Sequence, residues 1–154
     1  MKIRKMIPWI IVFLYTLWIF SNSLTIGETS GNISGRLARF LLQYVNAAGF
    51  TIAFDTFHFY VRKAAHVSEY ALLGFLVVIA IHLHPLCRPW LNFVSLWILI
   101  PSLDETIQHF VPDRYGCFRD VCIDMSGFTG GAFLSYLILL ILADLKKRMT
   151  KKSA

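Results

Sequence analysis

Two short polar blocks carry most of the side chains in this sequence that could do chemistry. The first block, RKAAHVSEY, covers residues 62–70, and the second, DETIQHFVPDRYGCFRDVCIDMSG, covers residues 104–127. They contain carboxylates, arginines and two histidines, although apolar runs flank them. Charged groups beside segments that favour lipid need a structural or chemical reason. We therefore expect the functional part of the molecule to lie in these two blocks.

The spacing within the blocks predicts that their polar side chains share helix faces. Residues three or four positions apart lie on the same side of a helix. For the second block this requires that the segment after Phe118 is already helical. Two charged helix ends could then meet. The residues with this spacing are Asp120 and Asp124, Asp104 and Gln108, Glu105 and His109, and Arg62, His66 and Glu69.

Metal binding and acid–base catalysis both fit these residue types. His66 and Glu69 have the i, i+3 spacing used for metal coordination in helical bundles, and the aspartates would add oxygen ligands for a divalent ion. If there is a reaction, His66 or Glu69 would be the natural general base. The candidate catalytic residues are His66, Glu69, Asp104, Glu105, Asp120 and Asp124, of which His66, Glu69, Asp120 and Asp124 are the candidate metal ligands.

Basic residues in the same blocks suggest an anionic substrate, because a guanidinium group pairs with phosphate or carboxylate through two hydrogen bonds. A purely structural network explains the same residues, with the basic groups neutralising the carboxylates and tying helix ends together. No serine stands in a Gly-x-Ser-x-Gly nucleophile motif. The candidate substrate-binding residues are Arg62, Lys63, Gln108, Arg114 and Arg119.

Composition predicts a membrane protein. Of the 154 residues, 56% are hydrophobic and only 16% are charged, and the mean hydropathy is +0.60, which is too apolar for a soluble domain of this size. The net charge of +6 could suggest nucleic acid. However, the basic residues gather at the two ends of the chain, a pattern that reports membrane orientation. We expect a lipid bilayer as the partner and no nucleic acid.

Four apolar segments are each close to the ~20 residues that cross ~30 Å of hydrocarbon as a helix. The positive-inside rule places both basic termini in the cytoplasm, which puts the polar blocks together on the outer side. The first segment could instead be a cleavable signal peptide, which would leave the other three crossings unchanged. The predicted spans are residues 6–24, 67–84, 90–110 and 125–143, followed by a cytoplasmic tail at 144–154.

The segments between the spans give weaker signals. Residues 21–35, rich in Ser, Thr, Asn and Gly, predict a loop. Residues 33–48 have the period of an amphipathic helix, on the membrane surface or packed as a lid on the bundle, and Gly49 is its expected stop. Residues 50–60 fit a re-entrant piece, an interfacial loop or the first turns of the second span equally well. Gly127, Gly131 and Ser135 form a small-residue stripe that predicts close helix packing.

The two blocks contain three spaced motifs: RKxxHxxEY from Arg62, DExxQxFxPxR from Asp104 and DxxxDxxG from Asp120. Together, and in this order, they resemble the signature of the VanZ-like membrane proteins over most of the chain. The resemblance implies a small protein of the bacterial inner or plasma membrane. It also implies a link to the glycopeptide teicoplanin, because the founding member of that family is associated with resistance to this drug. It implies no particular reaction.

These inferences combine into an all-α polytopic membrane protein, a single domain over residues 1–154 with four transmembrane helices and an outer-face amphipathic helix. The leading hypothesis is a VanZ-like envelope protein that binds or modifies an anionic, lipid-linked envelope precursor. As an enzyme it would be a metal-dependent hydrolase or transferase. The alternative is a non-catalytic scaffold that docks a partner protein. A transporter is disfavoured because four helices leave little room for a path.

Overall fold

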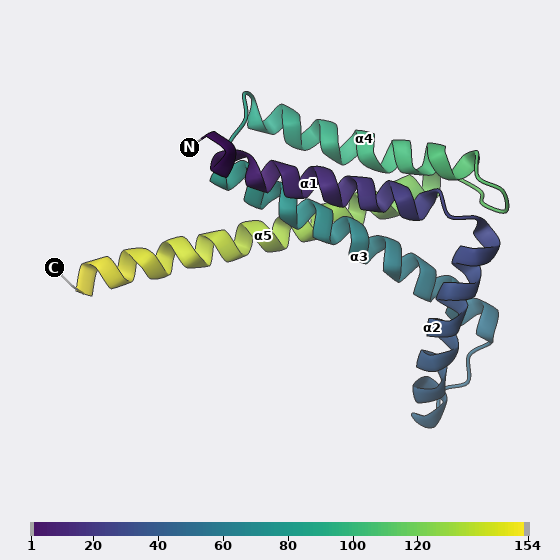
Figure 1. Ribbon diagram of the computed structural model, residues 1–154. Coiled ribbons are helices and arrows are strands. Elements are labelled where there is room, and N and C mark those ends of the chain that lie inside the picture. Colours follow the sequence, from purple (N-terminus) through teal and green to yellow (C-terminus); the bar gives the residue numbers. More distant parts are fainter. Residues whose placement is uncertain (1, 153–154) are drawn as a thin grey trace.

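The computed structural model describes residues 2–152, and helices account for most of them (Figure 1). The predicted all-α class is therefore confirmed for this part of the chain. The helices are α1 (Lys2–Ser23), α2 (Gly27–Ala47), α3 (Phe54–Leu83), α4 (Pro89–His109) and α5 (Phe118–Lys152).

A bundle of α1, α3, α4 and the first part of α5 forms the body of the molecule (Figure 1). The most extensive contact is between α3 and α5, and α1 packs on both α3 and α4. The second half of α5 and the whole of α2 leave the bundle in different directions. Both chain ends lie at one end of the bundle, and α2 lies at the other, beside the connection from α4 to α5.

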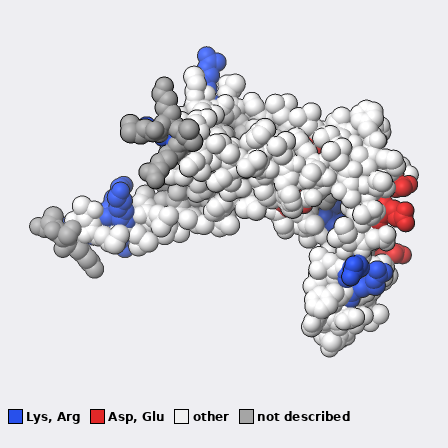
Figure 2. Space-filling view, in the orientation of Figure 1, with Lys and Arg blue, Asp and Glu red and all other residues white. Residues whose placement is uncertain are grey.

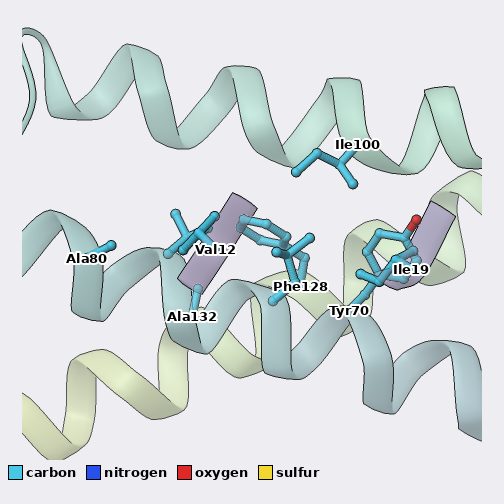
Figure 3. Packing of buried hydrophobic residues seen from close by; sticks show 9 residues of the cluster. Val12, Ile19, Tyr70, Ala80, Ile100, Phe128 and Ala132 are labelled. Carbon is cyan, nitrogen blue, oxygen red and sulfur yellow. The ribbon is translucent and has the colours of Figure 1, made fainter. Parts of the chain in front are cut away.

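The core of the bundle is a narrow line of apolar side chains contributed by four helices (Figure 3). Ile19 of α1, Tyr70 of α3 and Phe128 of α5 are almost completely buried, and Ile100 of α4 covers them from the other side. Phe128 also contacts Phe93 edge to face, with 5.5 Å between the ring centroids. This core holds together the helices that carry the two polar blocks.

Small residues on α5 allow it to approach α3 closely. A Cβ atom on Gly127 would stand 2.6 Å from the carbonyl oxygen of Val67, and one on Gly131 would overlap the carbonyl group of Ala71. These contacts advance in the same direction along both helices, so α3 and α5 run parallel. The predicted packing role of the small-residue stripe is confirmed.

Among the described residues, α1, α3 and α5 are long and apolar enough to cross a membrane. Most of their apolar side chains point outward, because only 17% to 28% of each candidate span is buried inside the molecule. Figure 2 shows the charged residues gathered towards the two ends, with a wide uncharged band between them. The protein is therefore a membrane protein. Helix α4, the third predicted span, is not among these three helices, and the four predicted crossings are therefore supported at three; α4 includes Asn92, Asp104 and Glu105.

The prediction of a loop at residues 21–35 is wrong. Helix α1 continues to Ser23 and α2 already begins at Gly27. The small residues there serve packing rather than flexibility: the N–H of Gly27 donates to the carbonyl of Pro112 at 3.1 Å, and a Cβ atom on Gly27 would overlap the backbone of Asp113. The amphipathic helix expected at residues 33–48 is thus longer at its N-terminal end.

The other boundaries follow the sequence more closely. Gly49 ends α2 as expected, with a φ of 91° that favours glycine. The undecided residues 50–60 include the first turns of the second apolar helix, because α3 begins at Phe54. The predicted tail at 144–154 continues α5 as far as Lys152, and its last two residues lie outside the described part of the chain.

Candidate functional site

The polar site lies at the end of the bundle next to α2, where α1, α3, α4 and α5 each contribute polar side chains from one or two helical turns. Asp104 and Glu105 stand near the end of α4, and Asp124 stands in the second turn of α5. His66 comes from α3. The last turn of α1 adds Ser23. The two blocks identified in the sequence therefore meet in space, which their helical spacing allowed but did not predict.

Four side chains form what we call the buried cluster: His66, Asp104, Glu105 and Asp124. One nitrogen or oxygen atom from each lies within 4.8 Å of the corresponding atoms of the other three. The carboxylates are almost inaccessible, since Asp104 is 1%, Glu105 5% and Asp124 0% exposed. His66 is partly buried, and its Nδ1 stands 3.4 Å from Oδ1 of Asp124. The cluster thus concentrates acidic groups in a place that excludes water.

Hydrogen bonds orient two of these carboxylates. Asp104 accepts from the hydroxyl of Ser23 at 2.5 Å and from the amide of Gln108 at 3.1 Å. Oε2 of Glu105 accepts from the backbone N–H of Cys117 at 2.9 Å. Within the described residues, Oε1 of Glu105 and both carboxylate oxygens of Asp124 accept no hydrogen bond. Buried polar atoms are normally paired, so these oxygens have free capacity for a ligand.

A cavity of about 310 Å³ with basic and apolar lining residues adjoins the buried cluster. His66 lines it together with Glu69, Arg62 and Arg114, and α2 contributes apolar side chains that include Ile33. The cavity therefore presents two arginines and the carboxylate of Glu69 next to an apolar wall.

Arg114 is fixed at the edge of this cavity. Its guanidinium donates to the backbone carbonyl of Asn22 at 3.0 Å. Burial lowers the pKa of Arg114, and the nearby positive charge of Arg62 lowers it further. A guanidinium group nevertheless stays protonated in proteins, so the cavity keeps its positive charge at neutral pH.

A second, more peripheral cavity of about 350 Å³ shares Arg62 and Arg114 with the first. Here Lys63 and Asp120 form an ion pair at 2.5 Å. Arg119 is exposed and lines neither of these two cavities. Of the basic residues that the sequence singles out, Arg62 and Arg114 have the best position to contact an anion.

The ligand set suggested by the structure differs from the one suggested by spacing alone. Of the four candidate metal ligands, His66 and Asp124 belong to the buried cluster. Glu69 stands in the cavity wall and accepts a hydrogen bond from Asn22 at 3.2 Å. Asp120 is paired with Lys63 instead. Asp104 and Glu105, which the sequence predicts as catalytic residues, complete the buried cluster in place of Glu69 and Asp120. Gln108 donates a hydrogen bond to Asp104 and does not line the cavity.

Sequence reasoning missed Asn22 and Ser23, which contact Glu69 and Asp104. Their signal was a short polar triplet at the end of an apolar helix, Ser21-Asn22-Ser23, which also fits a loop or a signal-peptide cleavage region. Only the packing of α1 against α3 and α4 shows that two of these side chains turn inward.

Comparison with protein families matches residues 7–141 to the family described as VanZ/LLP1. The matched range includes every residue of the buried cluster and both cavity arginines. Searches of the curated proteins and of the solved structures found no match.

Proposed function

The chain belongs to the VanZ/LLP1 family, and on that premise we propose that it binds an anionic, lipid-linked component of the bacterial cell envelope. The site of binding is the cavity between α1, α2 and α3. The proposal includes four membrane crossings, by α1, α3, α4 and α5, with both termini in the cytoplasm and the polar site on the outer face of the cytoplasmic membrane.

The distribution of charge along the bundle supports this orientation. Both chain ends lie at the same end of the bundle (Figure 1). Lys5 stands in the first turn of α1, and Lys146 and Lys147 follow the apolar part of α5. Such basic flanks favour the cytoplasm. Helix α4 has 21 residues, enough for ~31 Å at 1.5 Å per residue, and its two carboxylates lie at the end that would meet the outer headgroups.

The observation that carries the proposal is the composition of the 310 Å³ cavity. Its volume falls at the lower end of ligand pockets, which run from about 300 to 1,000 Å³. Two arginines offer forked donors that match phosphate or carboxylate oxygens. Ile33 and Leu37 of α2 give the same cavity an apolar side. A charged headgroup attached to a lipid tail needs both surfaces.

Helix α2 has the exposed apolar face that a lipid tail would follow. Ile33, Leu37 and Tyr44 stand on one side of the helix and are 65%, 50% and 63% exposed. Gly35 and Ala38 are instead buried, so α2 packs on the bundle through its small residues. A helix with separate apolar and basic faces suits the membrane interface.

Lipid binding to the purified full chain tests the proposal. Native mass spectrometry would compare a polyprenyl phosphate with the polyprenol of the same length. We expect the phosphate to bind and the alcohol to bind at least ~10-fold more weakly, because a hydrogen bond to a charged group contributes about 1.5–3 kcal/mol. The mass of the recovered lipid reports whether the protein also modifies it.

Arginine variants supply the control. Arg62→Gln and Arg114→Gln should each weaken binding of the phosphate, whereas Arg36→Gln, on the exposed face of α2, should not. Equal binding of phosphate and alcohol would contradict the proposal, as would an equal loss in all three variants, which would indicate a general effect of positive charge.

A structural hub is the second candidate, and the Lys63–Asp120 pair between α3 and α5 favours it. In that case the polar residues hold helix ends together and a partner protein docks on them. Glu69→Gln and Asp124→Asn separate the two proposals. A binding site that depends on the two arginines predicts normal accumulation in the membrane with lipid binding retained, whereas a hub predicts loss of the protein itself.

The family link also suggests a phenotype. Teicoplanin binds peptidoglycan precursors outside the membrane, on the side where we place the site. Expression in a susceptible bacterium should raise the inhibitory concentration of the drug, and Arg114→Gln should abolish the effect at equal protein level. An unchanged inhibitory concentration would separate this chain from the phenotype of the founding member.

A further inference from the structure

We infer that the buried cluster binds one divalent transition-metal ion, zinc or manganese, through His66, Asp104, Glu105 and Asp124. This inference rests on the geometry of the cluster and is independent of lipid binding in the neighbouring cavity.

The size of the cluster fits a single ion. Ligand atoms stand about 2.0–2.3 Å from Zn²⁺ or a similar divalent ion, so two ligands on opposite sides are ~4–4.6 Å apart and adjacent ligands are closer. In the buried cluster, one donor atom from each residue lies within 4.8 Å of all the others. The four side chains would draw closer together around a bound ion to bring their donor atoms to coordination distance.

Unpaired oxygens point to a missing partner. Asp124 is completely buried, and neither of its carboxylate oxygens accepts a hydrogen bond from the described residues. Oε1 of Glu105 and Nδ1 of His66 are also buried without a hydrogen bond. Leaving such atoms without a partner costs about 1–3 kcal/mol each, more for charged groups. Coordination of one ion by a single atom from each residue would give a partner to His66, Glu105 and one oxygen of Asp124 at once.

The charge of the cluster points to a cation. Three carboxylates share a space that excludes water, with the imidazole of His66 as the nearest basic group. Lys63 is engaged by Asp120, and Arg114 donates to the backbone of Asn22. Charges are buried only when they are paired or coordinate a metal. A bound divalent cation is often the largest local charge in such a site and offsets the acidic groups.

Hydrogen bonds around the cluster resemble those that orient metal ligands. Ser23 and Gln108 hold Asp104, and the backbone N–H of Cys117 holds Glu105 through one oxygen while leaving the other free. Ligating carboxylates in metal sites are usually fixed in this way by surrounding donors. The side chains are therefore positioned before any ion arrives.

The donor atoms select the class of metal. Imidazole nitrogen suits zinc, iron, nickel and copper, and carboxylate oxygen suits magnesium, calcium and manganese. One nitrogen with three carboxylates lies between these groups, which favours zinc or manganese. Cys117 and Cys122 are exposed and outside the cluster, so no thiolate directs the site towards softer metals.

Metal content of the purified full chain tests the inference. The protein would be stripped with a chelator in detergent, incubated separately with zinc and manganese, freed of loose ion and measured by elemental mass spectrometry. We expect about one ion per chain with at least one of the metals, since a preformed set of ligands retains its ion. Asp124→Asn and Glu105→Gln should lose it.

Asp120→Asn is the matched control, because Asp120 lies one turn before Asp124 on the same helix but pairs with Lys63. It should keep the ion. Retention by Asp124→Asn, or loss from Asp120→Asn alone, would overturn the proposed ligand set.

Two measurements on the unaltered chain guard against misfolded variants. Cobalt(II) bound by nitrogen and oxygen in the cluster should give visible absorption bands that differ from those of the hydrated ion, and zinc or manganese should raise the thermal unfolding temperature. A chain that takes up no ion, with no cobalt bands and no thermal shift, would overturn the inference and indicate that protons neutralise the carboxylates.

Discussion

Lys63 of α3 and Asp120 of α5 form an ion pair, with 2.5 Å between Nζ and Oδ1. One turn further along the same two helices, His66 faces Asp124 at 3.4 Å. The two contacts lie one helical turn apart between parallel helices, but their surroundings differ. The Lys63–Asp120 pair lines the peripheral cavity of about 350 Å³, whereas the carboxylate of Asp124 is completely buried. They should therefore differ in what they contribute.

The Lys63–Asp120 pair is expected to stabilise the fold modestly. Lys63→Gln and Asp120→Asn should each lower the free energy of unfolding, and the double-mutant cycle should give a coupling of about 1 kcal/mol, at the upper end for partly exposed pairs. Reversible unfolding in mixed micelles would measure it. A coupling near zero would show that solvent screens the pair completely.

The packing of α5 on α3 predicts a large effect at one glycine and almost none at its neighbour. Gly131→Val should destabilise the protein by about 2–3 kcal/mol, because its side chain would collide with the backbone of Ala71. Gly130→Ala should be neutral or stabilise by up to ~1 kcal/mol, because a Cβ atom there meets open space and alanine favours helix. Thermal unfolding in detergent compares them. Similar losses at both positions would argue against the close approach.

The end of α1 offers a second matched pair. Ser23→Ala removes a buried donor to Asp104 and should cost about 1–3 kcal/mol, since the acceptor is charged. Ser21→Ala should change stability by less than ~0.5 kcal/mol, because its exposed hydroxyl donates, among the described residues, to the carbonyl of Trp18 in the same helix. Unfolding curves recorded in the same detergent decide between them. If the two variants were equally stable, Ser23 would have no special role at the site.

Helix α2 is expected to lie in the membrane interface. A spin label at Tyr44→Cys, on the exposed apolar face, should be accessible to oxygen dissolved in lipid. A label at Asn46→Cys, exposed on the polar side, should be accessible to a water-soluble nickel complex. Electron paramagnetic resonance in liposomes measures both, with the native cysteines replaced by serine. The same accessibility at both positions would contradict an interfacial helix.

The native cysteines test the orientation directly. All three are free and exposed: Cys87 lies in the connection from α3 to α4, and Cys117 and Cys122 lie at the opposite end. In single-cysteine variants of intact cells, a membrane-impermeant maleimide should label Cys117 and spare Cys87. Labelling of Cys87 alone would invert the proposed topology.

Much of the architecture could be predicted because lipid imposes a simple pattern. Apolar runs of the required length located α1, α3 and α5. The condition for Asp120 and Asp124 to share a helix face, that the segment after Phe118 is already helical, is met because α5 begins at Phe118. The stripe at Gly127 and Gly131 correctly indicated close packing. Each of these signals is local, so a single sequence contains it.

The details of the site depend on contacts between distant segments. Ser23 and Asp104 are 81 positions apart in the chain, and no periodicity reports that their side chains meet. The same limit explains the metal ligands: spacing favoured Glu69 because it lies near His66 on α3, whereas packing brings Glu105 of α4 into the cluster. Small polar residues before Gly35 suggested a loop for an equally local reason, although they pack α2 onto its neighbours.

The length of α5 has a consequence for how deep the buried cluster sits. From Asp124 to Lys146 the helix rises ~33 Å at 1.5 Å per residue, close to the ~30 Å hydrophobic thickness of a bilayer. The basic residues at 146, 147, 148 and 151 would anchor that end to the anionic inner leaflet. The length of the helix would then fix the distance between Asp124 and these basic residues, and a thicker or thinner bilayer would change the tilt of α5. In the proposed orientation, the depth of Asp124 in the outer leaflet would thus be set by lysines and an arginine at the inner leaflet.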